Sequence, residues 1–288
     1  MRIKDTYISP FTDFGFKKLF GTEPNKDLLI DFLNTLLDKE TGEIIDLTYL
    51  PKEQLPPRIN DRKAIFDIYC ENTVGEKFIV EIQKAKQNYF KERSIYYSTF
   101  PIQQQAEKGD WDFKLTAVYT IGILDFIFDE DKDDTDVFHH EVQLFNKQTQ
   151  KCFYDKLTYI YLEMPKFTKT EAQLETHFDK WLYVLKNLSD LLERPQKLQD
   201  RVFQKLFEQA AIANYSDTEY AEYEESLKVY RDLQNVIDTA YDDGKLEGIE
   251  EGIQTEKRDN AYKMKQKGYT VEDIADITGL SIQTINTL

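Results

Sequence analysis

Residues 62–70, Arg-Lys-Ala-Ile-Phe-Asp-Ile-Tyr-Cys, and residues 77–83, Lys-Phe-Ile-Val-Glu-Ile-Gln, decide the fold of this chain. Apolar residues alternate along both segments, which is typical of β-strands. The residues between them include Asn-Thr-Val-Gly at positions 72–75, a sequence that favours a tight turn. The pattern therefore predicts a β-hairpin.

The turn sets the register of the two strands. If a three-residue loop ends at Gly75 in the left-handed conformation, Asn72 pairs with Glu76. Counting back along both strands, Asp67 then lies directly opposite Glu81. Two acidic residues are therefore expected to be neighbours on adjacent strands.

Strand alternation sorts the hairpin into two faces. The expected core face consists of Phe66, Ile68, Cys70, Phe78, Val80 and Ile82. The second, more polar face consists of Ile65, Asp67, Tyr69, Ile79, Glu81 and Gln83. The carboxylates of Asp67 and Glu81 converge there and repel each other unless a cation or a shared proton compensates their charge. A hard divalent cation such as Mg²⁺ is the ion that such oxygen ligands favour.

The composition limits the class of protein. The chain has 288 residues, of which 41% are hydrophobic, enough for one core and an accessory domain. Its net charge is −16, from 53 acidic and 37 basic residues, which argues against broad nonspecific affinity for nucleic acid. DNA binding would therefore need a local basic track, for which the candidates are Lys17, Lys18, Lys84, Lys86, Lys91 and Arg93.

The expected compartment follows from the cysteines and from hydropathy. Cys70 and Cys152 are too few for a disulfide framework, which favours a reducing environment. The chain begins without a signal-peptide pattern, and no apolar run approaches the roughly 20 residues of a membrane span. We therefore expect a soluble cytoplasmic protein without membrane contact.

The first part of the chain, residues 1–165, mixes helices and strands. The periodicity predicts helices over Phe14–Phe20, Lys26–Leu37 and Tyr89–Lys108, the last kinked at Pro101. Further strands are predicted over Ile44–Leu50, Leu115–Phe126, Val137–Phe145 and Leu157–Met164.

Residues 166–238 are expected to form a helical accessory region. Thr170-x-x-Gln173 and Ser216-x-x-Glu219 are capping-box patterns. Helices are predicted over Leu174–Leu192 and Gln196–Ala213, and from Glu219 to about Lys267.

Residues 239–267 continue the last helix as a linker that contains Gly244, Gly248 and Gly252. Glycines at this spacing indicate either a weak point in a solvated helix or a seam for homo-oligomerisation through the C-terminal helices. Residues 268–288 have helix-turn-helix features, with Thr270 and Ser281 as caps. The second short helix carries neither Lys nor Arg, so a packing or protein-contact motif is as good an interpretation as DNA readout.

The order of these elements resembles the PD-(D/E)xK nuclease superfamily and, within it, the recombination-promoting nuclease and transposase family. The residues that carry the resemblance are Ser9–Gly21 (SPFTDFGFKKLFG), Phe66-Asp67-Ile68, Val80–Gln83 and Glu92–Tyr97. The resemblance covers essentially the whole chain. It implies an α/β, restriction-endonuclease-like core with a central mixed sheet flanked by helices, followed by an all-helical C-terminal region.

The resemblance also implies metal-dependent DNA endonuclease activity, associated with recombination or a mobile element. Asp67, Glu81 and Gln83 would be the catalytic residues. Asp67, Glu81 and the Ile82 carbonyl would hold Mg²⁺, with Mn²⁺ as an alternative ion. Asp13 would be an outer ligand, or else simply the N-cap of the first helix.

Basic residues near these motifs would contact DNA phosphates. The candidates are Lys17, Lys18 and Arg93; the alternatives are solvated lysines and an Arg93 that pairs with Glu92 or Asp110. His139 and His140 are adjacent on a predicted strand, so they point to opposite faces and cannot share one ion. We assign them no catalytic role.

Two departures from the superfamily pattern leave a second hypothesis open. Phe66 replaces the usual proline, and Gln83 replaces the usual lysine, so position 83 can only orient water by hydrogen bonds. The alternative is a nuclease-like fold without turnover that acts through protein partners in regulation or defence. The excess of acidic residues favours that alternative, whereas the Asp67/Glu81 pair favours an active nuclease.

Overall fold

The computed structural model describes most of the chain, namely residues 5–37, 42–54, 64–106, 112–134 and 136–288. Two compact units, Met1–Tyr230 and Arg231–Leu288, divide the chain. The domain boundaries expected after residues 165, 238 and 267 remain predictions.

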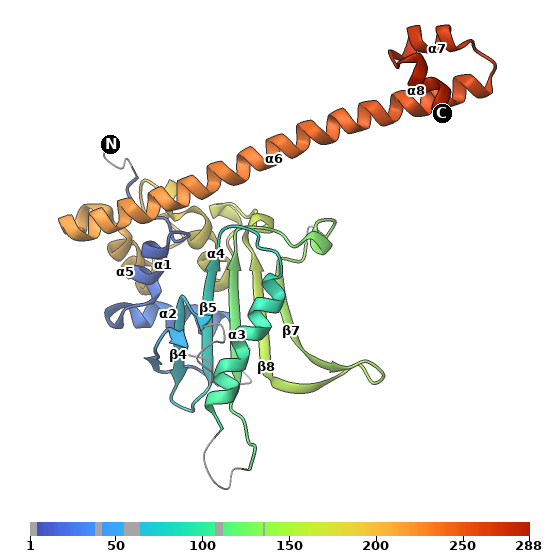
Figure 1. Ribbon diagram of the computed structural model, residues 1–288. Coiled ribbons are helices and arrows are strands. Elements are labelled where there is room, and N and C mark those ends of the chain that lie inside the picture. The colour runs from blue at the N-terminus through green and yellow to red at the C-terminus, as the bar shows by residue number, and fades with distance from the viewer. Residues whose placement is uncertain (1–4, 38–41, 55–63, 107–111, 135) are drawn as a thin grey trace. The chain divides into compact units, whose positions relative to one another are not determined.

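A six-stranded mixed sheet forms the centre of the first unit (Figure 1). Its spatial order is β1 (Leu47–Tyr49), β4 (Ile68–Asn72), β5 (Lys77–Gln83), β6 (Val118–Leu124), β8 (Lys151–Glu163) and β7 (His139–Asn146). Strands β5, β6 and β8 are parallel to one another, and the other pairs are antiparallel. A separate two-stranded sheet, not expected from the sequence, joins β2 (Glu53–Gln54) to β3 (Ala64–Ile65). The mixed sheet flanked by helices is confirmed.

Helices cover both faces of the sheet. The main core joins one face to α1 (Asp13–Phe20), α2 (Lys26–Leu36), α4 (His177–Asn187), α5 (Arg201–Ala210) and the start of α6 (Asp217–Gln266). The other face packs against α3 (Phe90–Gln104), which contains Pro101 (Figure 1). Short 3₁₀ turns occupy Glu23–Asn25, Asp129–Asp131, Met164–Lys166, Glu171–Gln173, Leu188–Asp190 and Ile212–Asn214.

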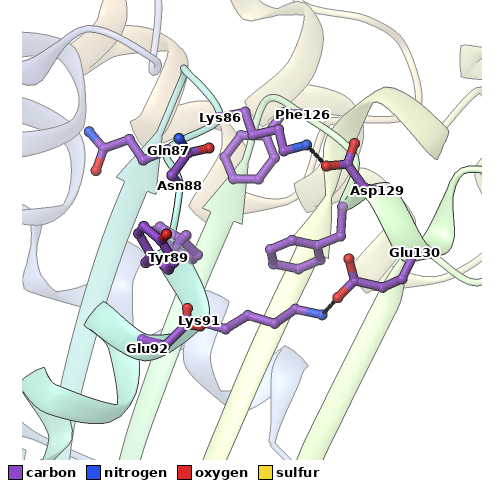
Figure 2. A pocket seen from close by; sticks show the side chains of 11 residues that line it. Lys86, Gln87, Asn88, Tyr89, Lys91, Glu92, Phe126, Asp129 and Glu130 are labelled. Carbon is purple, nitrogen blue, oxygen red and sulfur yellow. Dashed lines mark hydrogen bonds and ion pairs between the residues drawn. The ribbon is translucent and has the colours of Figure 1, made fainter.

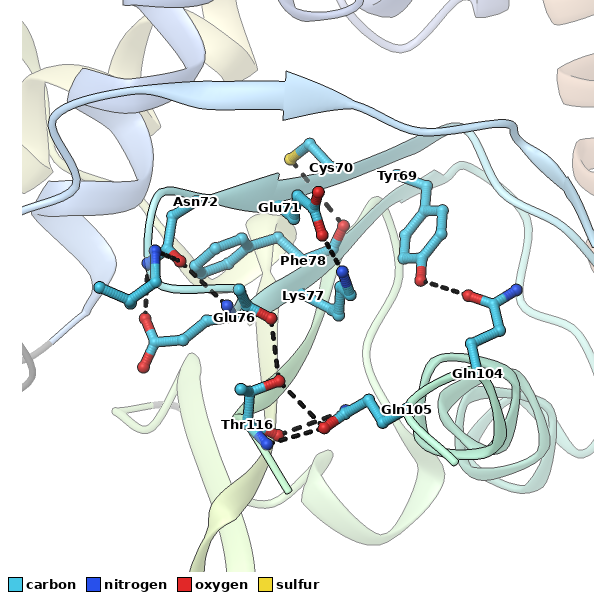
Figure 3. A network of polar contacts seen from close by, with 12 residues as sticks. Tyr69, Cys70, Glu71, Asn72, Glu76, Lys77, Phe78, Gln104, Gln105 and Thr116 are labelled. Atoms are coloured by element: carbon cyan, nitrogen blue, oxygen red, sulfur yellow. Dashed lines mark hydrogen bonds and ion pairs between the residues drawn. The ribbon is translucent and has the colours of Figure 1, made fainter. Parts of the chain in front are cut away.

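The register of the hairpin is the predicted one. Ile68 pairs with Val80, and Cys70 pairs with Phe78. Asn72 N donates to Glu76 O at 3.1 Å, and the intervening loop ends at Gly75, whose φ is +84° (Figure 3). The left-handed glycine thus fixes which residues face each other along both strands.

The C-terminal end of α3 is fixed to the same hairpin. Tyr69 OH donates to Gln104 Oε1 at 2.9 Å (Figure 3). Gln105 Oε1 accepts from Thr116 N at 2.7 Å, and Thr116 Oγ1 donates to Gly75 O at 2.9 Å. Because these bonds connect α3 to the hairpin, they also position the residues at the N-terminal end of α3 relative to the strands.

The prediction that Phe66 lies on the core face is wrong. Phe66 packs against Tyr69 at a centroid distance of 5.2 Å, in the cluster beneath α3. Phe66 and Asp67 lie outside β4, and Asp67 occupies a bend between β3 and β4. A bend interrupts the two-residue period of a strand, so side chains before it no longer alternate in phase with those after it.

Several expected boundaries differ from the observed ones. The Thr170/Gln173 capping box is present but begins a 3₁₀ turn, whereas α4 begins at His177 with its own box from Thr176 and Asp179. The strand expected over residues 115–126 is limited to Val118–Leu124. Pro56, Pro57, Arg62, Lys63 and the end of the predicted helix at residues 107–108 lie outside the described residues.

The second unit consists of the C-terminal part of α6 with α7 (Val271–Thr278) and α8 (Ile282–Thr287). The caps expected at Thr270 and Ser281 are confirmed, and Gly279 ends α7 with φ +69°. The three helices bury Ala261, Ile274 and Ile285 in one small cluster. Among the described helices, none combines the length and the apolar character that crossing a membrane requires.

The close approach of Gly15 to the chain before α1 yields a test of this packing. A Cβ atom at Gly15 would lie 2.1 Å from Ser9 O and 2.7 Å from Thr12 Oγ1, the N-cap acceptor of α1. Gly15→Ala should therefore lower the free energy of unfolding by about 1–3 kcal/mol in urea denaturation followed by Trp181 fluorescence.

The control is Gly244→Ala in α6, where a Cβ atom would meet nothing within 4 Å. This substitution should stabilise the helix by about 1 kcal/mol, measured by circular dichroism at 222 nm, because alanine has the higher helix propensity. A Gly15→Ala protein as stable as the wild type would contradict the packing described for α1.

Candidate active site

Asp67 and Glu81 meet where β4 begins beside β5. Glu81 Oε1 accepts a hydrogen bond from Asp67 N at 3.2 Å. Asp67 Oδ2 in turn accepts from Ile82 N at 2.9 Å. Each carboxylate therefore bonds to the backbone of the segment that carries the other, which brings both acidic groups to one place.

The hydrogen-bond ladder explains this arrangement. Gln83 O accepts from Asp125 N, so the peptide groups of Gln83 face β6 and those of Ile82 face β4. On the β4 side Phe66 would be the next partner of Ile82, but Phe66 N donates to Lys52 O at 3.1 Å. The Asp67 carboxylate takes the bond from Ile82 N instead, and the Ile82 carbonyl points to the same side as that carboxylate.

Burial raises the pKa of both Asp67 and Glu81. Glu81 is 9% exposed, and burial together with the negative charge of Asp67 raises the pKa of Glu81 to about 8. Burial also raises the pKa of Asp67, although the hydrogen bond from Ile82 N and the charges of Lys17 and Lys52 act in the opposite direction. In both groups burial outweighs the effect of the neighbouring cations, so the pair favours a proton or a bound cation. Two carboxylates and a carbonyl oxygen form a donor set that suits a hard divalent cation.

Gln83 and Arg93 form the next part of the site. Gln83 Oε1 accepts from Arg93 Nη2 at 2.8 Å, and Gln83 Nε2 donates to Ala85 O at 3.0 Å. Arg93 Nη1 donates to Gln87 Oε1. The positive charge of Arg93 lowers the pKa of Glu81, so the guanidinium lies within electrostatic reach of the acids. These two amides, not Glu92, are the partners of Arg93, and Asp110 lies outside the described residues.

The first helix contributes charges to the same region. Thr12 is the N-cap of α1, because its hydroxyl accepts from Gly15 N, so the interpretation of Asp13 as the cap is wrong. Asp13 forms an ion pair with Lys17 at 2.6 Å, and both residues shift the pKa of Asp67 through their charge. Lys18 pairs with Glu219 of α6 instead.

The remaining lysines of the expected basic track also have partners. Lys86 pairs with Asp129, and Lys91 pairs with Glu130. The ammonium of Lys84 lies over the ring of Tyr230. The positive charge of this track is therefore largely balanced within the protein itself.

The structure adds one cation that the sequence did not indicate. Lys52 is partly buried, and its carbonyl accepts a hydrogen bond from Phe66 N. Burial lowers the pKa of Lys52, and the negative charge of Asp67 acts in the opposite direction. Its distance from Asp67 along the chain hides this proximity, because no short motif includes both residues.

A second group of ligand-type side chains consists of Asp131, His140 and Glu163. His140 Nε2 lies 3.1 Å from Glu163 Oε2, whereas the ring of His139 packs against Phe178, so the adjacent histidines do point to different surroundings. The Lys166 ammonium lies 2.7 Å from Glu163 Oε2 and already compensates its charge. An ion-pair network is therefore the simplest interpretation of this group.

One comparison with known proteins identifies a family to which this chain is similar. A family model described as "PD-(D/E)XK nuclease family transposase" matches residues 10–240. No curated protein and no solved structure matches. The matched range covers most of the chain, including α1, the hairpin and α3, and so confirms the resemblance and the restriction-endonuclease-like α/β fold.

The raised pKa of Glu81 predicts how stability depends on pH in the absence of divalent ions. The folded protein retains the Glu81 proton to a higher pH than the unfolded chain, so the folded state binds more protons between pH 5 and 8. The free energy of unfolding in EDTA should therefore fall as the pH rises through this window, by at most about 1.4 kcal/mol per pH unit. Chemical denaturation at each pH measures this.

Glu81→Gln should remove that part of the pH dependence, because glutamine does not titrate. Glu175→Gln, at an exposed position before α4, is the matched control and should retain the wild-type slope. Identical profiles for wild type and Glu81→Gln would contradict the assignment of a protonated Glu81 to the metal-free protein.

Proposed function

The chain belongs to the PD-(D/E)XK nuclease family of transposases, and on this basis we propose that it is a Mg²⁺-dependent DNA endonuclease associated with recombination or a mobile element. The observation that carries the proposal is the meeting of Asp67 and Glu81, two carboxylates whose pKa values burial raises despite the neighbouring cations. Both carboxylates accept backbone hydrogen bonds, but these bonds leave the repulsion between the two acids to be relieved by a proton or a bound cation.

The donor set of the proposed metal site consists of the Asp67 and Glu81 carboxylates and the Ile82 carbonyl. Asp13 belongs to the outer part of the site, where it interacts with Lys17. Oxygen donors of this kind favour Mg²⁺, with Mn²⁺ as the alternative. When bound, such an ion lowers the pKa of a water molecule and stabilises charge on the phosphoryl oxygens.

Gln83 and Arg93 are proposed to position the substrate. The hydrogen bonds to Arg93 and Ala85 hold the Gln83 amide in one orientation, so that it can align a water molecule but cannot remove its proton. Arg93 offers a planar guanidinium for a phosphate oxygen. Lys17 and Lys18 would add phosphate contacts after leaving their ion pairs with Asp13 and Glu219.

One observation favours the alternative function, a nuclease-like fold that acts through protein partners. Lys18, Lys86 and Lys91 each form an ion pair with an acidic residue, so the protein presents little uncompensated positive charge to a phosphate backbone. DNA would have to displace these acids or bind through the metal and the residues around Arg93. The two functions therefore differ in a measurable requirement for the divalent ion.

The test is cleavage of a supercoiled plasmid in Mg²⁺ and, separately, in Mn²⁺. Asp67→Ala and Glu81→Ala should each reduce the rate on the order of 10²-fold or more, because each removes a charged ligand of the ion that stabilises the transition state. The isosteric variants Asp67→Asn and Glu81→Gln guard against misfolding, and Glu175→Gln serves as the unaffected control.

Cleavage that survives both substitutions would reject the proposed site. A correctly folded wild type that cleaves no DNA in either ion, but retains its stability and pH profile, would support the alternative function without turnover.

A further inference from the structure

A cavity of about 440 Å³ lies between residues 86–92, which lead into α3, and residues 126–130 after β6 (Figure 2). It begins three positions after Gln83, beyond the end of β5, the strand that carries Glu81 and Gln83. Its volume falls within the roughly 300–1,000 Å³ that is typical of sites for small ligands. The cavity contains none of the residues assigned above to the metal site.

A single guanidinium connects this cavity to the candidate active site. Arg93 Nη2 donates to Gln83 Oε1, and Arg93 Nη1 donates to Gln87 Oε1. Gln87 lines the cavity, whereas Gln83 follows Glu81 by two positions on β5. A phosphate held at Arg93 would therefore have the cavity immediately to one side, at the position of an adjoining nucleotide.

The inner wall of the cavity is aromatic. Phe126 packs edge-to-face against Phe90 and Phe128, with centroid distances of 5.9 and 5.7 Å. These rings are mostly buried, and the Lys91 ammonium lies 4.1 Å from the centroid of the Phe128 ring, so the wall combines apolar rings with one ion-paired lysine. An aromatic wall of this kind binds flat, apolar surfaces such as those of ring systems.

Tyr89 provides an exposed ring at the same cavity. Tyr89 is 75% exposed, and its backbone has φ +64°, in the left-handed region that non-glycine residues adopt at a cost. In Figure 2 Tyr89 lies on the opposite side of the cavity from Asp129 and Glu130. The strained backbone thus holds a large aromatic side chain in solvent, where it contributes little to the core.

The charges of the lining indicate what kind of group the cavity suits. Lys86 and Lys91 are paired with Asp129 and Glu130 (Figure 2), and Glu92 adds a further negative charge. A phosphate in this cavity would be repelled by the acidic residues, because Asp129 and Glu130 already neutralise the two lysines. A neutral heterocycle meets no such obstacle, and the amides of Gln87 and Asn88 offer hydrogen bonds to its polar edge.

We propose that this cavity binds an unpaired nucleobase next to the phosphate that is cleaved, with Tyr89 stacking on the base. The preferred substrate would then be DNA that is single-stranded or locally unpaired at the cleavage position. This inference rests on the proposed nuclease function, because the base is placed by a phosphate at Arg93. Stacking of a base on an aromatic side chain supplies affinity without sequence preference.

The test is DNA binding in Ca²⁺, under conditions that support binding without relying on cleavage, with 2-aminopurine as a fluorescent base. One oligonucleotide carries the probe in a short single-stranded gap, and a second of equal length is fully paired. The wild type should bind the gapped DNA more tightly and quench the probe, because stacking on an aromatic ring quenches its fluorescence. The paired duplex should show neither effect.

Tyr89→Asn is the informative variant, because asparagine tolerates the left-handed backbone but removes the ring. It should weaken binding of the gapped DNA by roughly 5- to 100-fold and abolish the quenching, without altering affinity for the paired duplex. Tyr89→Trp should retain both effects. The matched control is Phe153→Ala, which removes a similarly exposed ring on β8 that does not line the cavity. This variant should behave as the wild type.

Equal affinity of wild type and Tyr89→Asn for the gapped DNA would overturn the proposal, as would the absence of quenching in the wild type. Plasmid cleavage that depends on Asp67 and Glu81 but not on Tyr89 would reject this inference and leave the proposed function standing. Quenching that depends on Tyr89, in a protein without any cleavage activity, would reject the proposed function while retaining the base site.

Discussion

The candidate site depends on two hydrogen bonds, from Asp67 N to the Glu81 carboxylate and from Ile82 N to the Asp67 carboxylate. Each carboxylate bonds to a peptide N–H in the segment of the other, across the start of β4 and the end of β5. These bonds exist because the chain bends at Asp67 and Lys52 O takes the hydrogen bond of Phe66 N. The bend leaves Ile82 without its ladder partner, so a carboxylate completes the ladder and both acids are held in a buried position.

The second constraint is the attachment of α3 to the hairpin. Gln104 and Gln105 connect the C-terminal end of the helix to Tyr69 and Thr116, while Arg93, near its N-terminal end, bonds to Gln83. The helix therefore bridges the turn of the hairpin and the acidic end of β5. An arginine held in this way connects Gln83, at the end of β5, to Gln87 in the lining of the aromatic cavity.

Much of this arrangement could be predicted from the sequence, because it depends on local patterns. The left-handed Gly75 and the alternation of β4 and β5 determine the register, and so place Asp67 opposite Glu81. The bend before β4 could not be predicted, because it depends on Lys52, which is distant along the chain. The same holds for the neutralised basic track, since Asp129 and Glu130 reach Lys86 and Lys91 only in the folded sheet. The sequence shows charges, but their partners depend on topology.

The central claim is that Asp67 and Glu81 share one divalent cation, and calorimetric titration with Mn²⁺ at pH 7 tests it most directly. The wild type should bind one ion per chain and release protons, because binding displaces the proton that Glu81 holds at a pKa of about 8. Asp67→Asn and Glu81→Gln should each lose this binding, whereas His140→Ala, in the separate Asp131–His140–Glu163 group, should retain it. Mn²⁺ binding that persists in the first two variants and disappears in the third would contradict the account.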